Sequence, residues 1–372
     1  MAASIPAFSL QQQSRHIASA VEAAVARVLA SGRYAQGPEC EALESELAAA
    51  LGGGLRTLTC SSGTDALHLA LRAAGVGAGD VVLTTPFTFF ATAGAILLAG
   101  ARPEFVDIDP ESFNLSPAAL EAALARPRTG RLAAVLPVHL YGRMADMPRL
   151  LALAGGAGVA VIEDAAQAIG AQLQGQAAGG WGALGCFSFY PTKNLGAMGE
   201  GGLVTTRDAA LHDRLKLLRV HGSRRRYEHE TLGWNARMHE LQAAILRAKL
   251  PHLPEWNRRR RQIAAGYEER LAGVGQVKLP ARTPDHVFHQ YVIRTPRRDE
   301  LRQHLQEHGV GSEIYYPQPL HQQPALRQLG HLPLPEAERA AREVLALPMF
   351  PELGDGELDR VADGIGAFWR AA

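Results

Sequence analysis

The sequence predicts an α/β protein in which a mostly parallel sheet has helices on both faces. Between about residues 55 and 220, short β-rich runs alternate with helical segments, which is the pattern of βαβ units. The chain has 372 residues, of which 47% are hydrophobic and 20% charged, so it is long enough for more than one domain. We therefore expect a large domain over residues 1–252, with an N-terminal helical segment, and a small C-terminal α/β domain over residues 253–372.

The elements of the large domain follow one another in a regular order. The expected strands are LRTLTC, VVLTT, PEFVDI, LAAVLPV and VAVIED, followed by GCFSFY and GGLVTT. The first five alternate with helices at GTDALHLALRAAG, at FFATAGAILLAG, after Pro117 and at MPRLLALAGGAG. In such sheets ligands bind beyond the carboxyl ends of the strands, so polar residues that follow strands are the candidates for a site.

The second domain begins near residue 253, where the helix MHELQAAILRAKL gives way to a proline-containing stretch and a long amphipathic helix. We expect a strand at FHQYVIR, a helix at RDELRQHLQEHG and a second strand that runs into EIYYPQPLH. Helices are expected to begin at Pro335 and Asp355. The run of four arginines at 258–261 is expected on a helix surface, where long charged side chains are solvated.

Composition excludes several classes of function. Lys and Arg number 38 against 37 Asp and Glu, so there is no overall field to attract nucleic acid or an anionic membrane. Cys40, Cys60 and Cys186 are widely spaced in apolar surroundings, which indicates reduced core thiols and no metal site. No stretch has the length of a membrane span and the N-terminus lacks a secretory pattern, so we expect a cytoplasmic protein.

Lys193 is the first candidate for chemistry. It lies between GCFSFY and GGLVTT and is flanked by glycines, which places it on a loop between two strands. A lysine desolvated at a sheet edge has a lowered pKa and becomes a nucleophile that can form a Schiff base. The alternative interpretation is an ordinary loop lysine with its ammonium in water.

Three further groups are expected at the same edge of the sheet. Asp164 ends the strand VAVIED and is suited to hold a ring nitrogen protonated, although it could instead cap a helix. The turn at Gly63 and Thr64 begins a helix and offers amides to a phosphate, with simple capping as the alternative. Phe89 follows a strand and could stack on a flat heterocycle or pack in the core. Together with Lys193, these groups describe a pyridoxal 5'-phosphate site.

Seven motifs extend this interpretation to the whole chain. They are, in order, SSGTDALHLAL, TPFTFFAT, PVHLYG, EDAAQAIGA, CFSFYPTKNLGAMGEGG, GWNARMHELQAAIL and YYPQPLHQQP. This series resembles the DegT/DnrJ-type sugar aminotransferases. The resemblance implies the fold type I architecture with a mostly parallel seven-stranded sheet, and a homodimer with its sites at the subunit interface. It also implies a nucleotide-linked keto sugar as amino acceptor and an amino acid, L-glutamate, as donor.

The resemblance also implies roles for individual residues. Lys193 would form the Schiff base with the cofactor, Asp164 would pair with its pyridine nitrogen, and Gln167 would neighbour its ring hydroxyl. Gly63, Thr64 and Ser188 would hold the phosphate, and Asn235 would reach the phosphate of the other subunit's cofactor.

Substrate choice is less constrained. Members of the family with histidine in place of Lys193 remove a hydroxyl, so the lysine argues against that chemistry. FYPTKNLG is similar to members that act on 3-keto sugars, with a 4-keto sugar as the alternative. Tyr315 stands where many relatives have histidine. Arg224, Arg225 and Arg226 could bind a diphosphate or form a solvated charged run.

His139 and Tyr141 follow the strand LAAVLPV and face the expected site, but a hydrogen-bonded core histidine is an equally open interpretation of His139. Two other functions remain possible from the sequence: an aminotransferase for small amino acids, and a regulatory protein that binds the cofactor without turnover.

Overall fold

A computed structural model describes residues 4–330 and 332–371. In this part of the chain, seven strands form one sheet in the order β1-β9-β8-β5-β4-β2-β3. The strands are β1 (Arg56–Cys60), β2 (Asp80–Thr84), β3 (Arg102–Phe105), β4 (Arg131–Leu136), β5 (Ala160–Asp164), β8 (Leu184–Ser188) and β9 (Gly202–Thr206). From β3 to β8 neighbouring strands are parallel, while β9 is antiparallel to both β8 and β1. The predicted α/β class with a mostly parallel sheet is confirmed.

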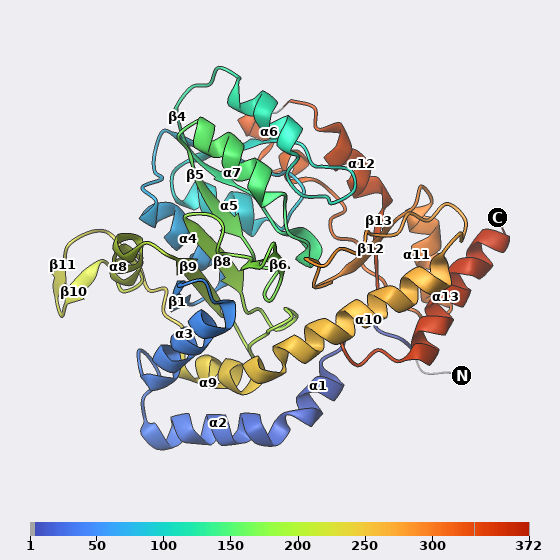
Figure 1. Ribbon diagram of the computed structural model, residues 1–372, viewed down its shortest axis with the longest axis horizontal. Coiled ribbons are helices and arrows are strands. Elements are labelled where there is room, and N and C mark those ends of the chain that lie inside the picture. Colours follow the sequence, from blue (N-terminus) through green and yellow to red (C-terminus); the bar gives the residue numbers. More distant parts are fainter. Residues whose placement is uncertain (1–3, 331, 372) are drawn as a thin grey trace.

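Helices cover both faces of this sheet (Figure 1). One face packs against α3 (Pro38–Leu51), α6 (Pro117–Leu124), α7 (Met147–Gly156) and α9 (Glu240–Lys249). The other face packs against α4 (Gly63–Ala73), α5 (Ala91–Leu98) and α8 (Ala209–Leu218). Alternate residues of each strand enter the two cores: in β5, Val161 belongs to the first and Ile162 to the second. The strands are therefore apolar on both faces, as parallel strands under helices are.

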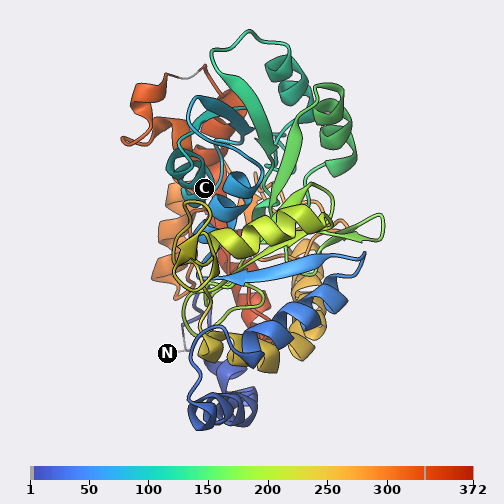
Figure 2. The ribbon, with the colours of Figure 1, turned by 90° about the vertical axis from the view of Figure 1, so that its left-hand side faces the viewer.

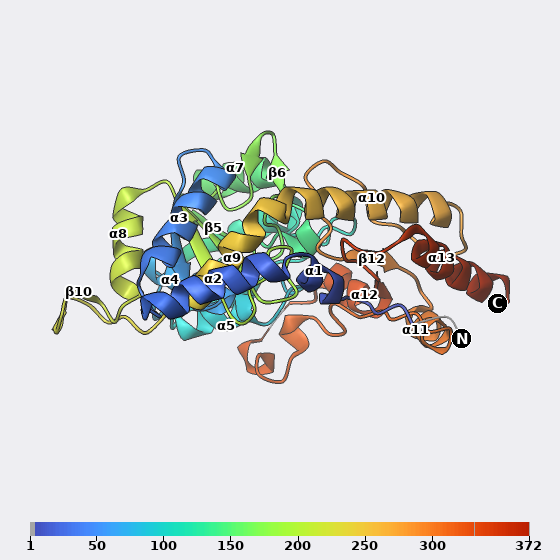
Figure 3. The ribbon, with the colours of Figure 1, turned by 90° about the horizontal axis from the view of Figure 1, so that it is seen from below.

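The N-terminal helices lie along the outside of the large body, which is the seven-stranded sheet with the helices that cover it. After α1 (Gln11–His16), α2 (Ala18–Ser31) runs beside α9, and Figure 3 shows the two side by side from below. Ala24 and Val28 of α2 pack on Ala244 of α9. Among the described residues, no helix is both long and apolar enough to cross a membrane.

Beyond α9 the chain passes through a short 3-10 turn, η2 (Leu250–His252), into the long helix α10 (Leu253–Leu271), which Figure 1 shows running toward the C-terminal part. That part contains β12 (Tyr291–Arg294), α11 (Arg298–Glu307), α12 (Pro335–Glu343), β13 (Val344–Leu347) and α13 (Asp355–Arg370). Its core joins α10, α11 and α13 and includes Ile5 from the N-terminus. A domain boundary at residue 253 stays a prediction.

Two details of the C-terminal part differ from the prediction. The strand that pairs with β12 is β13, whereas the segment predicted at EIYYPQPLH makes an isolated bridge between Glu313 and Ala346. Pro317 and Pro319 cannot donate to a ladder, which limits that segment to a bridge. The arginine run 258–261 is not a uniform surface either. Arg260 is buried, and its Nη1 donates to the carbonyls of Phe288 at 3.1 Å and His289 at 3.2 Å.

Short elements complete the description. They are the 3-10 turns η1 (Leu140–Gly142), η3 (Leu320–Gln322) and η4 (Arg327–Leu329) and the hairpins β6 (Gln172–Leu173) with β7 (Gln176–Ala177) and β10 (Ser223–Arg225) with β11 (Glu228–His229). The β10–β11 hairpin projects from the body beyond α8, and Figure 2 views the molecule from that side. Its arginines are exposed, and Arg224 pairs with Glu230 at 2.9 Å.

Candidate active site

Lys193 lies on the loop between β8 and β9, as the sequence predicts. Its backbone N–H donates to the carbonyl of Tyr190 at 2.8 Å, which closes a tight turn. The residue is half-buried, and burial lowers the pKa of its amine to about 8, partly opposed by the nearby charge of Asp164. Because Lys193 is half-buried, a lysine with its side chain fully in water does not describe it.

Asp164 is the last residue of β5 and is buried at the carboxyl end of the sheet. Its Oδ2 accepts a hydrogen bond of 2.8 Å from Thr92, and its Oδ1 accepts one of 3.2 Å from the N–H of Ala166. Burial raises the pKa of this carboxyl, against the lowering effect of the Thr92 hydrogen bond. Residues 165–170 form turns, so Asp164 caps no helix there. Asp164 and Lys193 thus lie at the same edge of the sheet. Burial disfavours the charged form of both side chains, the carboxylate of Asp164 and the ammonium of Lys193.

The start of α4 follows β1 and lies against the end of β8. Ser62 caps the helix, because its Oγ accepts a hydrogen bond of 3.1 Å from the N–H of Asp65. Gly63 rests directly on Ser188 of β8: a Cβ at Gly63 would lie 2.6 Å from the Cβ of Ser188. Gly63, Thr64 and Ser188 therefore meet where first-turn amides lack intrahelical partners and the helix dipole attracts an anion.

Phe89 and Gln167 lie near a residue that the sequence analysis did not single out, Tyr316. Phe89 is 60% exposed, and its ring lies 6.5 Å from that of Tyr316, so it is not a core residue. Gln167 accepts from the N–H of Tyr141 at 2.6 Å and donates through Nε2 to the Tyr316 hydroxyl at 3.3 Å. Gln167 is thus held between the backbone of Tyr141 and the hydroxyl of Tyr316. The Tyr141 hydroxyl in turn donates to the carbonyl of Tyr315.

His139 is a hydrogen-bonded core histidine, the second of the two interpretations given above. It is fully buried; its Nδ1 accepts from the N–H of Ala145 at 3.1 Å, and its Nε2 bonds Glu163 at 2.9 Å. Because Nδ1 is an acceptor, Nε2 bears the proton and donates it to the carboxylate. His139 therefore holds β5 in place beside Asp164.

Asn235 lies apart from Lys193 on an exposed stretch between β11 and α9. Its Oδ1 accepts a hydrogen bond of 2.9 Å from Arg237. The neighbouring Trp234 stacks on His68 of α4 with ring centroids 4.1 Å apart, and its Nε1 donates to Asp65 at 3.0 Å. This segment is anchored beside the α4 terminus while Asn235 itself faces outward, and its role toward another subunit stays a prediction.

Two features of the site depend on residues that the sequence analysis missed. Thr92 supplies the hydroxyl that bonds Asp164, and Asn194, the residue after Lys193, anchors the loop through hydrogen bonds of its side chain. The only hint of Thr92 is its place three residues after Phe89, a helical spacing that sets both residues on one turn.

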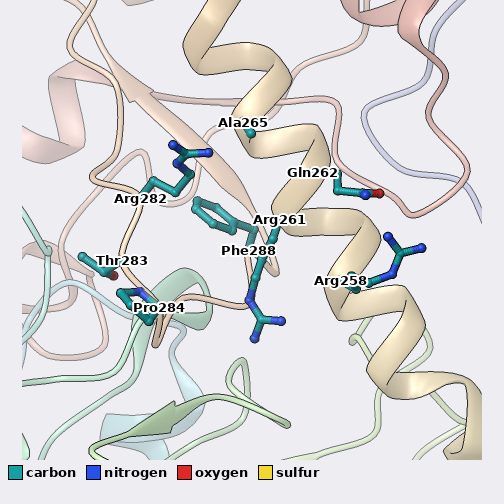
Figure 4. A pocket seen from close by; sticks show the side chains of 8 residues that line it. All are labelled: Arg258, Arg261, Gln262, Ala265, Arg282, Thr283, Pro284 and Phe288. Atoms are coloured by element: carbon teal, nitrogen blue, oxygen red, sulfur yellow. The ribbon is translucent and has the colours of Figure 1, made fainter.

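A cavity of about 420 Å³ near the C-terminal part is separate from this site (Figure 4). It lies between α10 and residues 282–288, and three arginines line it. Each already has a partner: Arg258 bonds Glu255 at 2.7 Å, Arg282 pairs with Glu268 at 2.9 Å, and Arg261 donates to the carbonyl of His286 at 3.2 Å. Their partners neutralise most of its charge, so we assign it no role in the chemistry.

Relatives match this chain over almost its full length. A protein of Acidithiobacillus ferrooxidans named UDP-N-acetyl-3-dehydro-alpha-D-glucosamine 3-aminotransferase is 46% identical over 96% of this chain and 96% of its own. A protein of Geobacillus stearothermophilus named pleiotropic regulatory protein is 47% identical over 98% of this chain and 99% of its own.

Solved structures of similar proteins superpose closely on this chain. DesV of Streptomyces venezuelae, determined in complex with a ketimine intermediate, superposes with a TM-score of 0.94 at 43% identity over 99% of both chains. NtdA of Bacillus subtilis, determined with bound cofactor PMP, superposes with a TM-score of 0.93 at 30% identity over 100% of this chain and 86% of its own. Residues 15–366 match the family model of the DegT/DnrJ/EryC1/StrS aminotransferases. This chain belongs to the DegT/DnrJ/EryC1/StrS aminotransferase family.

Proposed function

We propose that this aminotransferase uses pyridoxal 5'-phosphate to move an amino group from L-glutamate to the keto carbon of a nucleotide-linked 3-keto hexose. The observation that supports it most directly is the pairing of Lys193 with Asp164. A half-buried amine with a pKa of about 8 and a buried carboxyl with a raised pKa lie at one sheet edge, beyond strands β5 and β8. Opposed shifts of this kind are typical of sites that divide acid and base roles.

The residues present fit the cofactor. The buried Asp164 carboxyl needs a cationic partner to be stably ionised, which a protonated pyridine nitrogen provides. The close contact of Gly63 with Ser188 leaves no room for a larger side chain at residue 63, and the turn there presents amides and hydroxyls of the kind that bind a phosphate. Phe89 offers an exposed ring of the size that stacks on a heterocycle.

Each residue then has a distinct task. When bound, pyridoxal phosphate supplies an aldehyde that captures amines and a ring that accepts electrons. The amine of Lys193 would take up the proton of the donor's α-carbon as a general base, for which a pKa near 8 is suited. Asp164 keeps the ring nitrogen protonated, and Thr92 and Ala166 orient that carboxylate by hydrogen bonds to its two oxygens.

The names of the relatives favour a 3-keto sugar. The Acidithiobacillus protein is named for a 3-dehydro sugar linked to UDP, and a 44% identical protein of Streptomyces venezuelae is named dTDP-3-amino-3,4,6-trideoxy-alpha-D-glucose transaminase. The FYPTKNLG motif points the same way. A 4-keto sugar nucleotide is the alternative, and Tyr315 and the exposed arginines 224–226 stay candidates for sugar or diphosphate contacts.

A regulatory role is the second candidate, favoured by the name of the Geobacillus relative. A protein that only senses a ligand has no need of a lysine with a lowered pKa beside a desolvated carboxyl. We therefore give the enzyme reaction precedence. We also propose a homodimer in which Asn235 completes the partner's site, and a cytoplasmic location remains the expectation from the sequence.

The test is the visible absorption of the purified protein loaded with pyridoxal phosphate. With L-glutamate and no sugar, the band of the lysine-bound cofactor should give way to that of pyridoxamine phosphate. A panel of UDP- and dTDP-linked 3-keto and 4-keto hexoses should then restore the first band, fastest with a 3-keto sugar. Lys193→Ala should show neither change, whereas Lys216→Ala, on the exposed face of α8, should behave as the parent. A loaded protein indifferent to glutamate would favour the regulatory role.

A further inference from the structure

Lys249 is a buried lysine that none of the steps above uses. It is the last residue of α9, and only 3% of its surface is exposed. Its ammonium donates a hydrogen bond of 2.5 Å to the carbonyl of Gly196, which lies three residues after Lys193 on the same loop. Within the described residues, Lys249 forms no ion pair with a carboxylate, and burial alone lowers its pKa to about 8.

A buried cation at this position is costly for folding. Moving an ammonium out of water without an opposite charge destabilises the folded state, and a methionine would fill similar space without that cost. The composition makes the choice of lysine more informative, because only four of the 38 basic residues are lysines. Lys216 and Lys278 are exposed, while Lys193 and Lys249 are the two that enter the interior of the large body.

The hydrogen bond from Lys249 to Gly196 fixes the position of more than one residue of the loop. The loop folds back on itself, since a Cβ at Gly196 would lie 2.2 Å from the carbonyl oxygen of Pro191. Fixing Gly196 therefore also fixes Pro191, and Lys193 lies between them. A second residue of α9, Gln242, accepts a hydrogen bond of 2.9 Å from the N–H of Met198. The helix thus holds the C-terminal half of the loop at two points.

Asn194 holds the same loop from the other side. Its Nδ2 donates to Asn257 of α10 at 2.7 Å and to the carbonyl of Val287 at 3.3 Å, and its Oδ1 bonds His289 at 3.1 Å. The contacts of Asn194, Gly196 and Met198 with these other segments do not involve the side chain of Lys193. Such an arrangement fixes the backbone from which the amine reaches the reacting atoms.

We propose that Lys249 is a positioning residue: its buried ammonium holds the Gly196 carbonyl and thereby fixes the loop from which Lys193 acts. A charge-assisted hydrogen bond is stronger than a neutral one, which explains why a cation is retained here in spite of its cost. The role given to Lys193 rests on the proposed function; the fixation of the loop does not.

The first experiment uses the cofactor-free protein and hydrogen exchange followed by mass spectrometry. In Lys249→Met, amides of residues 190–198 should exchange faster than in the parent, while other peptides keep their rates. The unfolding midpoint should be no lower than that of the parent, because the substitution removes a buried charge. Lys216→Met, which alters an exposed lysine on α8, is the matched control and should change neither quantity.

The second experiment measures the glutamate half-reaction of the loaded enzyme. In Lys249→Met, kcat should fall by about tenfold or more with little change in KM, because misplacing a catalytic group slows the chemical step rather than donor binding. Lys249→Gln keeps a donor that is shorter and neutral, so it should retain an intermediate rate. It also replaces Lys249→Met in both experiments if that variant fails to fold.

Three outcomes would overturn the proposal: loop exchange equal to that of the parent, an unchanged kcat, or faster exchange throughout the molecule with a loss of stability. The last would make Lys249 merely structural. If the parent itself does not react with glutamate, the proposed function fails, and the exchange experiment still decides whether Lys249 fixes the loop.

Discussion

At the scale of the residue, burial sets the properties of the site. The same desolvation lowers the pKa of Lys193 and raises that of Asp164, because both shifts favour the uncharged form. Burial therefore disfavours the charged form of each group, and a ligand can offset this by a positive charge beside the carboxylate or by a reaction with the neutral amine. A cationic ring nitrogen beside Asp164 and an aldehyde beside Lys193 would satisfy both.

The lowered pKa of Lys193 predicts how cofactor attachment depends on pH. Only the neutral amine attacks an aldehyde, so the rate of covalent attachment to the cofactor-free protein should rise as pH increases through about 8 and then level off. Stopped-flow absorbance with borohydride trapping would measure it. Lys193→Ala should trap no cofactor at residue 193, and a rate that keeps rising well above pH 8 would show that burial does not depress this pKa.

The hydrogen bond from Thr92 to Asp164 leads to a second prediction, on cofactor affinity. Replacing it with valine removes the hydrogen bond that stabilises the Asp164 carboxylate, so the pKa of Asp164 should rise further and its pairing with the ring nitrogen should weaken. A hydrogen bond to a charged group contributes about 1.5–3 kcal/mol, so the cofactor should bind about tenfold more weakly or worse. Titration of the cofactor-free protein measures this affinity.

The control for Thr92 is Thr295→Val. The hydroxyl of Thr295 is buried in the C-terminal part and has no hydrogen-bond partner among the residues that the structure describes, so the same substitution there should leave cofactor affinity unchanged. An unaltered affinity in Thr92→Val would contradict the role given to its hydroxyl.

At the scale of the element, side chains from distant segments fix the ends of helices. Glu240, at the start of α9 and 1% exposed, accepts hydrogen bonds from the N–H groups of Gly37 at 2.9 Å, Glu39 at 2.8 Å and Cys40 at 3.3 Å. Its carboxylate thus caps α3, whose N-terminus has no cap of its own, and favours the positive end of that dipole. The contact joins α3 to the helix that also holds the Lys193 loop.

Glu240→Gln should lower the free energy of unfolding by about 1–3 kcal/mol, because one of the accepting oxygens becomes an amide that cannot accept from an N–H. Urea unfolding of the purified protein is the measurement. Glu228→Gln, on the exposed hairpin, should leave the unfolding midpoint unchanged. Equal midpoints for the parent and Glu240→Gln would refute the cap.

The same scale shows what could be predicted from the sequence. The sheet and the loop of Lys193 were predictable because alternating strands and helices and the glycines around residue 193 are local patterns. The strand at Val344–Leu347 was missed because it follows α12 without a turn residue, so it resembles a continuation of that helix. Arg260 was misjudged because only tertiary packing distinguishes it from its three arginine neighbours. Thr92 was missed because its contact with Asp164 spans 72 residues.

At the scale of the whole molecule, several exposed aromatic and apolar residues lie near the site and on the hairpin beyond α8. Phe89 and Tyr190 are exposed at the sheet edge, and Tyr227 and Leu232 are 82% and 83% exposed in and after the β10–β11 hairpin. Exposed side chains of this kind are typical of interaction surfaces. Asn235 is exposed just beyond them, as expected of a residue that acts on a second copy of the chain.

Mixing two inactive variants would test this arrangement. In a dimer with shared sites, Lys193→Ala lacks the catalytic amine, and Asn235→Asp places a negative charge against the phosphate of the partner's cofactor. A mixed dimer contains one site with both residues intact, built from Lys193 of one chain and Asn235 of the other. Random mixing in equal amounts should therefore restore about a quarter of the parental turnover, since half of the dimers are mixed and each has one working site of two.

The control is a mixture of Lys193→Ala with a chain that has both substitutions, which should remain inactive because no site regains Lys193. Sedimentation of the parent should show a dimer at assay concentrations. Activity that does not recover in the first mixture, although subunits exchange, would mean that Asn235 serves its own chain; the exposed hairpin and sheet edge would then need another occupant.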